Sequence, residues 1–285
     1  MLTEEEAAVL QALPPAGVIL FGRNVENPAQ LAGLTGAVRD LLGPEAVVMV
    51  DQEGGRVARL RPPHWAAHPP AAAIGALFSR DAGAGLRAAW LQGALIGHQV
   101  FAAGFDVVCA PVLDLRFPGA SDVVGDRAFG ADPHLVSVLA AAMAAGLLAA
   151  GVQPVGKHAP GHGQAVVDSH HALPVVVAPA AAELVPFREN AGLPWMMTAH
   201  VLYPDWDCDH PATLSARVIE RVIRGEQQIG FAGLLVSDDL AMGALTGAVE
   251  QRAARALAAA RALAAARRMR LDPGPMLAER NALLR

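Results

Sequence analysis

Six short runs of apolar residues recur along the chain, and most are followed by a stretch with the periodicity of a helix. Apolar strands that alternate with helices are typical of a parallel sheet wound with helices, because both faces of every strand are then covered. The expected strands are GVILF (17–21), VVMV (47–50), FDVVCA (105–110), VQPV (152–155), PWMMT (194–198) and GLLV (233–236). The alternation therefore predicts an α/β fold.

The expected helices begin at recognisable signals. Thr3 followed by Glu6 matches a capping box, and Asn27 followed by Pro28 suits the first turn of a second helix. The pattern predicts helices over residues 3–13, 27–42, 84–103, 133–150, 214–229 and 250–270.

Polar side chains stand where each expected strand ends. In a (β/α) barrel these ends converge on one face, whereas an open doubly wound sheet gathers them at one switch point. The residues are Arg23, Asn24, Asp51, Asp114, Lys157, His158, His200 and Asp238. We therefore expect a TIM-barrel-like (β/α) fold in a single domain over residues 1–285, with the open sheet as the alternative. The sequence lacks the glycine-rich fingerprints of nucleotide sites.

Charge and cysteine content restrict the partners. The net charge is −5 without a long run of either sign, which argues against a nucleic-acid or anionic-membrane partner. The two cysteines form no disulfide framework, the acidic N-terminus does not resemble a signal peptide, and no apolar run is long enough to cross a bilayer. We expect a soluble cytoplasmic protein.

The segment from Gly156 to His171, GKHAPGHGQAVVDSHH, concentrates titratable residues directly after an apolar run. Such a segment is costly to bury without partners, which favours a catalytic or binding loop over a solvated turn. Asp168 stands two residues before His170, so its carboxylate can hold one imidazole nitrogen and leave the other to exchange a proton. The alternative is a buried structural histidine. Lys157 and His158 are expected just beyond the strand, where a turn would bring both to one ligand.

Three further segments offer polar side chains. Asp51 begins DQEGGRVARL, and Arg59 lies within reach of it; they suit binding of hydroxyl groups, or form a structural pair. Arg127 in GDRAFG offers a fork of donors, or forms a surface salt bridge. Of Asp238 and Asp239, which follow the last strand, only one is expected to face the site, as a nucleophile or a metal ligand.

A metal site is the less favoured reading. The candidate ligands are Asp51, His158, His170, His200 and Asp238, but no HExxH or CxxC spacing supports them.

Several motifs in register resemble glycoside hydrolase family 3 and, within it, the bacterial β-N-acetylglucosaminidases of peptidoglycan recycling. They are GVILFGRN, VDQEGGRVARL, APVLDL, GDRAFG, KHAPGHG with DSH, MTAH, PATLS and LLVSDDLAM. The resemblance covers about residues 3–260. Residue 159 departs from it, because alanine stands where phenylalanine or isoleucine is usual.

The resemblance implies a retaining mechanism in which Asp238 is the nucleophile and His170, assisted by Asp168, is the acid/base. It implies no metal and no organic cofactor, and a GlcNAc-1,6-anhydro-MurNAc muropeptide as the substrate. It also implies that the N-acetylglucosamine unit is bound by Asp51, Arg59, Arg127, Lys157 and His158. Two alternatives stay open: a catalytically weakened sugar-binding remnant, and transfer of the sugar to phosphate instead of water.

The strand count departs from that family. Its barrel has eight strands and only six are found here, so the first and eighth strands, neighbours in a closed barrel, are expected to be missing. The strands at 17–21 and 233–236 would then be open edges, which invite pairing with another chain. We expect an incomplete barrel whose gap is covered in part by the helix over 250–270, or by a second copy through self-association at the open edge.

Overall fold

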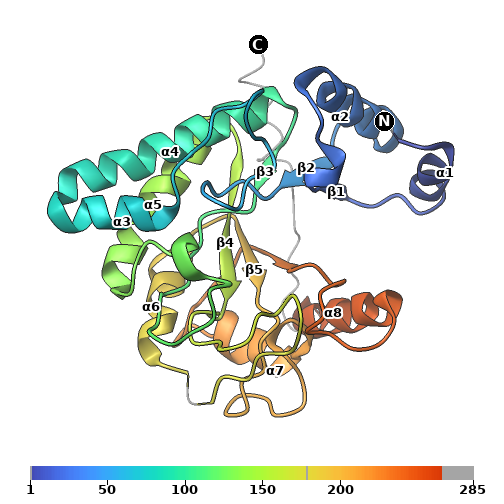
Figure 1. The fold of residues 1–285 in the computed structure, drawn as a ribbon. Helices are drawn as coiled ribbons and strands as arrows, with labels where there is room; N and C mark the ends of the chain where they lie inside the picture. The colour runs from blue at the N-terminus through green and yellow to red at the C-terminus, as the bar shows by residue number, and fades with distance from the viewer. Residues whose placement is uncertain (1, 178, 265–285) are drawn as a thin grey trace.

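The computed structural model describes residues 2–177 and 179–264, and its centre is one parallel sheet (Figure 1). Neighbouring strands pair in sequence order, from β1 at one edge to β6 at the other. The strands are β1 (Gly17–Leu20), β2 (Val47–Val50), β3 (Val107–Val108), β4 (Gln153–Ala159), β5 (Trp195–Thr198) and β6 (Leu234–Ser237). This sequential parallel order is that of a (β/α) barrel and not of a doubly wound sheet, where the order reverses at a switch point.

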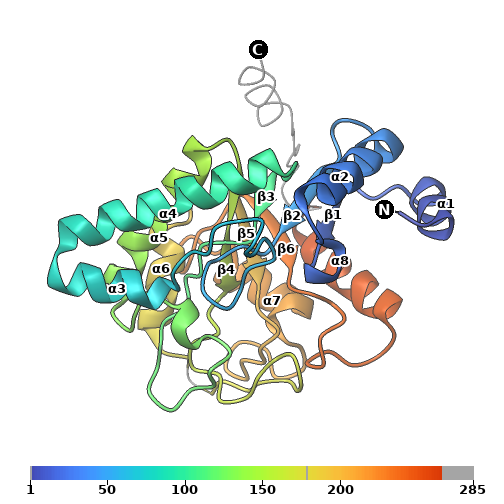
Figure 2. The same cartoon turned by 45° about the horizontal axis from the view of Figure 1, so that its top comes forward.

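Helices lie on both sides of the strands (Figure 2). They are α1 (Glu4–Ala12), α2 (Pro28–Leu42), α3 (Ala71–Arg80), α4 (Ala82–Ala102), α5 (Pro133–Ala149), α6 (Ala181–Glu189), α7 (Ala216–Val218) and α8 (Val249–Ala264). The capping box at Thr3 and the Asn27 cap are both formed, with Pro28 in the first turn of α2. No helix among the described residues combines the length and apolar character that crossing a membrane requires.

The two faces of the sheet bury different clusters. Val107, Cys109 and Val155 join Trp195 and Met197 in a small cluster on the inner face. The alternate residues, such as Val108 and Met196, belong to the larger core that includes the buried faces of the helices. This alternation follows from the twofold periodicity of a strand, and it explains why the strands are apolar throughout.

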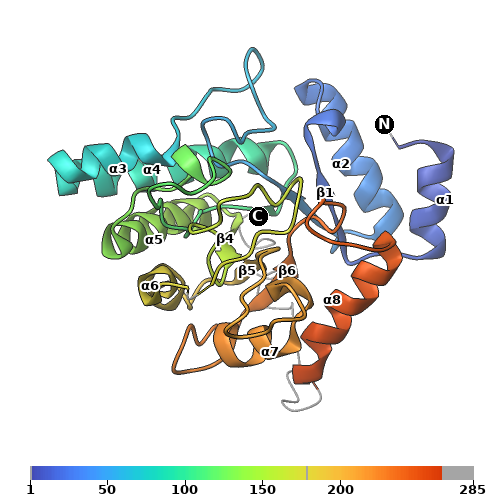
Figure 3. The ribbon, with the colours of Figure 1, turned by 60° about the horizontal axis from the view of Figure 1, so that its bottom comes forward.

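The barrel is incomplete. The expectation of six strands is confirmed for the described residues, and β1 and β6 are the two edges of the sheet. All four residues of β6 are only half-buried, whereas all four residues of β5 are buried, and Ile19 of β1 is 38% exposed. Helix α8 packs against α7 and the short helical turns beside it (Figure 3). Residues 265–270 of the expected last helix lie outside the described residues.

Two helices were missed in the sequence, and one expected helix needs correction. Helices α3 and α6 were not predicted, because a proline-rich stretch precedes the first and Pro186 interrupts the periodicity of the second. The helix expected over 214–229 is shorter and irregular: α7 continues into a π-helical turn, Ile219–Ile223, and the chain then leaves the helix near Gly225.

Candidate active site

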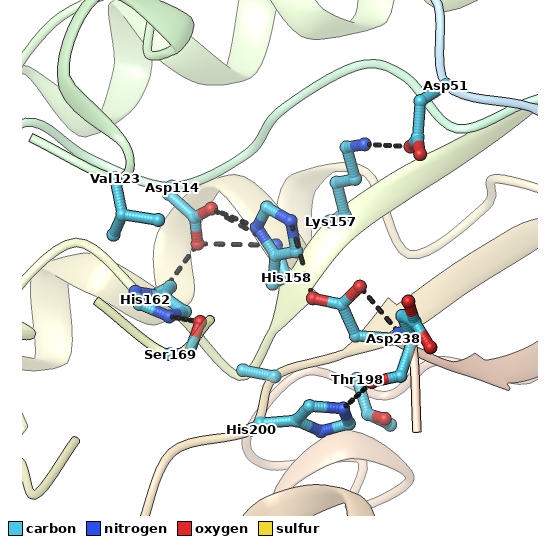
Figure 4. A network of polar contacts seen from close by, with 12 residues as sticks. Asp51, Asp114, Val123, Lys157, His158, His162, Ser169, Thr198, His200 and Asp238 are labelled. Atoms are coloured by element: carbon cyan, nitrogen blue, oxygen red, sulfur yellow. Dashed lines mark hydrogen bonds and ion pairs between the residues drawn. The ribbon is translucent and has the colours of Figure 1, made fainter. Parts of the chain in front are cut away.

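The carboxyl ends of the strands converge on a pocket of about 230 Å³. All eight site residues predicted from the sequence line this one pocket: Asp51, Arg59, Arg127, Lys157, His158, Asp168, His170 and Asp238. Residues that sequence reasoning did not select also line it, among them Glu53, His162 and Ser169. Figure 4 shows how several of these side chains face one another.

Lys157 and His158 lie on β4 itself, so the expectation that they follow the strand is wrong. Strand β4 runs to Ala159, its register against β5 shifts between Gly156 and Ala159, and both side chains line the pocket. The strand therefore continues into the site, and no turn beyond its end is needed to bring the two side chains together.

Lys157 is bound by two carboxylates. Its Nζ lies 2.9 Å from Asp51 Oδ1 and 2.6 Å from Glu53 Oε1, while Arg59 donates to the other oxygen of Asp51 at 3.1 Å. Burial opposes the charge on Lys157, but Asp51 and Glu53 outweigh it and raise the lysine pKa. The amine is therefore a fixed cation in a nearly closed environment.

Arg127 forms a bidentate pair with Glu53. Its Nε donates to Oε2 at 2.9 Å and its terminal nitrogen donates to Oε1 at 2.8 Å. Burial opposes ionisation of Glu53, but the cations of Arg127 and Lys157 prevail and hold the pKa of Glu53 well below its ordinary value. The pair is buried, so the surface salt bridge considered for Arg127 does not describe it.

Asp114 holds His158 and the backbone of His162 by hydrogen bonds. It is fully buried; it accepts from His158 Nδ1 at 2.6 Å and from the backbone N–H of His162 at 2.7 Å. Burial opposes its ionisation, but His158 outweighs it and lowers the pKa of Asp114. With Nδ1 engaged, the imidazole of His158 turns Nε2 toward the pocket, 4.0 Å from Asp238 Oδ2.

Asp238 follows β6 and faces the pocket (Figure 4). Burial opposes its ionisation, but His158 and His200 lower its pKa, so it is a carboxylate at neutral pH. Beside it, His200 is fully buried, with Nδ1 2.8 Å from Thr213 Oγ1 and Nε2 3.0 Å from the carbonyl oxygen of Asp239. Because a carbonyl only accepts, Nε2 of His200 carries a proton.

The Asp168–His170 pair stands at the rim of the pocket. Asp168 Oδ1 lies 2.7 Å from His170 Nδ1 and also accepts from the His170 backbone N–H at 2.8 Å. Burial of Asp168 opposes its ionisation, but these bonds from His170 lower its pKa. The His170 side chain is 58% exposed, so it is not a buried structural histidine.

Sequence reasoning gave no site role to Glu53, His162 or Ser169. Glu53 shares the DQEGG segment with Asp51, two residues earlier, and this spacing offered a signal for it. His162 was considered only as a packing residue. Asp114 and His200 were noted as polar strand ends, but their hydrogen-bond partners come from other segments and could not be read from spacing.

Within the described residues, no group of three or more histidine, cysteine, aspartate or glutamate side chains is arranged to hold a metal ion. Of the ligands considered from the sequence, Asp51 pairs with Lys157 and Arg59, His200 bonds Thr213, and His170 bonds Asp168.

An incomplete parallel barrel whose strand ends surround a polar pocket is a fold that carries enzyme sites, and an ionised aspartate with an aspartate-held histidine suits glycoside hydrolysis, with a histidine in place of the carboxylic acid that most glycoside hydrolases use. The comparison with known families agrees. Residues 1–282 match the glycosyl hydrolase family 3 N terminal domain, and the chain belongs to this family. The family expected from the sequence motifs is thus confirmed.

Two curated relatives are both named beta-hexosaminidase. Beta-hexosaminidase of Bordetella avium is 40% identical over 266 residues, which cover 90% of this chain and 75% of the relative. Beta-hexosaminidase of Alkalilimnicola ehrlichii is 43% identical with the same coverage. Among solved structures, NagZ from Neisseria gonorrhoeae in complex with N-trifluoroacetyl-D-glucosamine has a TM-score of 0.82 and 38% identity, covering 90% of this chain and 76% of that one. The likeness supports the expectation of a glycoside hydrolase.

Proposed function

We propose that this protein is a retaining β-N-acetylhexosaminidase that removes non-reducing terminal GlcNAc from GlcNAc-1,6-anhydro-MurNAc muropeptides during peptidoglycan recycling in the cytoplasm. The observation that carries the proposal is the meeting of Asp238, ionised and facing inward, with the Asp168–His170 pair in one pocket. The shared name of the relatives and the N-trifluoroacetyl-D-glucosamine bound to a similar structure support the substrate class.

In the first half of the reaction, a carboxylate oxygen of Asp238 attacks the anomeric carbon of GlcNAc while the glycosidic bond breaks. His170, as imidazolium, donates its Nε2 proton to the departing oxygen, so that the leaving sugar departs as a neutral alcohol. In the second half, neutral His170 takes a proton from water, and the oxygen of that water attacks the same carbon. This releases GlcNAc with its original configuration and restores the Asp238 carboxylate.

The remaining charged side chains suit recognition of the sugar. Asp51 accepts from hydroxyl groups, while Arg59, Arg127 and Lys157 donate to hydroxyl and carbonyl oxygens. The existing ion pairs fix these groups before the sugar arrives, which lowers the cost of ordering them on binding. His158, held by Asp114, lies between this set and Asp238, so it contacts both the sugar and the nucleophile.

The first test is release of nitrophenol from 4-nitrophenyl β-GlcNAc. Asp238→Asn should abolish release, and a 5-fluoro-GlcNAc glycoside should leave a trapped sugar on Asp238 that mass spectrometry locates. The matched control is Asp239→Asn, because Asp239 caps the N–H of Ala241 through Oδ1 and asparagine keeps that acceptor. Turnover that survives in Asp238→Asn would contradict the proposed nucleophile. Repeating the assay with inorganic phosphate separates hydrolysis from transfer to phosphate.

A second candidate, a sugar-binding remnant with little turnover, is favoured by one observation. β6, which carries the nucleophile, is an open edge with all four residues half-exposed. A misplacement of about 1 Å can reduce a rate about 100-fold. Calorimetric binding of GlcNAc by folded protein that shows no turnover would favour the remnant over the enzyme.

A further inference from the structure

Ser169 lies between the two members of the acid/base pair and differs from both in burial. It is 2% exposed, whereas the side chains of Asp168 and His170 are 34% and 58% exposed. The Ser169 hydroxyl oxygen lies 2.9 Å from His162 Nε2. The exposed pair is therefore attached to the protein through the residue between its members.

His162 connects this serine to the floor of the pocket. Its backbone N–H donates to Asp114 Oδ1 at 2.7 Å, and the same carboxylate holds His158. Burial lowers the pKa of His162 to about 4, so its ring is neutral at physiological pH. Within the described residues, Nδ1 of His162 has no hydrogen-bond partner, and the contact with Ser169 is what orients the ring.

The loop that follows the nucleophile holds the same segment from the other side. Ala244 N–H donates to the carbonyl oxygen of Ser169 at 3.1 Å, and Gly243 N–H donates to that of His170 at 3.0 Å. A Cβ at position 243 would lie 2.7 Å from the carbonyl oxygen of His171 and 2.8 Å from that of His170. Only glycine permits this close approach of the two loops.

We infer that Ser169 is a positioning residue. It attaches the Asp168–His170 pair to His162, which Asp114 holds, and to the loop that follows Asp238, and so it sets the distance between the acid/base and the nucleophile. The inference rests on the proposed function. Residues 168–171 form no regular secondary structure and the histidine is exposed, so nothing within the segment itself sets the distance from His170 to Asp238. The three contacts through Ser169 and His170 set it instead.

The test compares two β-GlcNAc substrates that differ in their need for an acid. A methyl glycoside has a poor leaving group and needs the proton of His170, whereas a 2,4-dinitrophenyl glycoside departs without it. Ser169→Ala removes one oxygen and keeps both backbone contacts, and Gly243→Ala pushes the loops apart. For both variants, kcat/KM on the methyl glycoside should fall roughly 10- to 100-fold relative to the dinitrophenyl glycoside, a part of the 10²–10⁴-fold that acid/base catalysis supplies.

Each variant has a control with the same substitution at a position outside the pocket. Ser137→Ala removes an equally buried hydroxyl, which donates to Pro133 on α5, and Gly36→Ala adds a Cβ that meets nothing within 4 Å on α2. Both should leave the ratio of the two substrates unchanged. If Gly243→Ala does not fold, Ser169→Ala carries the test alone, with its melting temperature confirming the fold.

The outcomes separate the two proposals. A selective loss on the methyl glycoside, with azide accelerating turnover of the dinitrophenyl substrate in Ser169→Ala, supports the positioning role. Equal losses on both substrates, or no loss, would overturn the positioning role. The proposed function would still stand in that case, as long as the wild-type protein turns over the substrates. If the wild-type protein turns over neither substrate, the proposed function fails and this inference fails with it.

Discussion

Replacing Glu53 by glutamine should destabilise the protein more than any comparable surface change. Glu53 is 6% exposed, and its carboxylate accepts three charge-assisted bonds, from Lys157 at 2.6 Å and from Arg127 at 2.8 and 2.9 Å. Glutamine has nearly the same shape but only one acceptor oxygen, and its amide protons face the two cations. The variant therefore leaves the buried guanidinium of Arg127 without its paired carboxylate, while Lys157 keeps only Asp51.

The magnitude follows from the geometry. Removing one partner of a buried ion pair costs about 3–5 kcal/mol, because the remaining charge stays desolvated. For a chain of this size, a loss of about 3–5 kcal/mol corresponds to a melting temperature lower by roughly 6–10 °C. Affinity for GlcNAc should also fall, because Lys157 and Arg127 lose the group that orients them.

Urea denaturation followed by circular dichroism measures the free energy of unfolding, and calorimetry measures GlcNAc binding. The matched control is Asp126→Asn, which removes a carboxylate from an arginine pair in the same region whose side chains are 49% and 45% exposed. That change should cost at most about 1 kcal/mol. If Glu53→Gln costs no more than Asp126→Asn, the buried pair does not have the role assigned to it.

Three further predictions concern other parts of the molecule. Burial, with a smaller contribution from Asp114, raises the pKa of Glu183 from its ordinary 4.5 to about 8, so its contribution to stability is complete below pH 4.5 and is lost as the pH rises through 8. Glu183→Gln should therefore raise the melting temperature relative to wild type near pH 9 and not near pH 4.5; equal shifts at both would refute the pKa. His200→Ala leaves the Asp239 carbonyl without this partner beside Asp238, the proposed nucleophile, and should lower kcat at least about 10-fold with KM little changed; unchanged kcat would contradict this. Ile19→Lys places a charge on the exposed edge strand and should reduce any concentration-dependent association seen by sedimentation velocity, whereas association unchanged by this substitution would exclude the β1 edge as the contact.

Much of the fold could be predicted from local sequence pattern. Apolar runs such as VVMV and GLLV fall on β2 and β6 almost residue for residue, because a covered parallel strand must be apolar on both faces. The same pattern predicted six strands, and the open edges were predicted by comparing that count with the eight-stranded barrel of the family that the motifs resemble. The helix expected over 214–229 was wrong because periodicity does not register a π-helical turn, and α6 was missed because Pro186 interrupts its periodicity.

Sequence patterns selected residues that line the candidate site, but not the hydrogen bonds and ion pairs between them. Strand ends and motifs selected Asp51, Lys157 and Asp238, since polar residues after buried strands are conspicuous in sequence. The residues that each of these side chains pairs with could not be read from the sequence. Lys157 meets Asp51 across 106 positions of sequence, and His158 meets Asp114 across 44.

An α/β chain of six apolar strands with polar residues at their ends could be read from the residues alone, because these features follow from periodicity and burial along neighbouring residues. The contacts of Glu53 with two cations, and of Ser169 with His162 and with the loop after Asp238, appear only in the folded structure. Hydrogen bonds between distant segments depend on the relative placement of whole strands and loops, and no local pattern of residues specifies that placement.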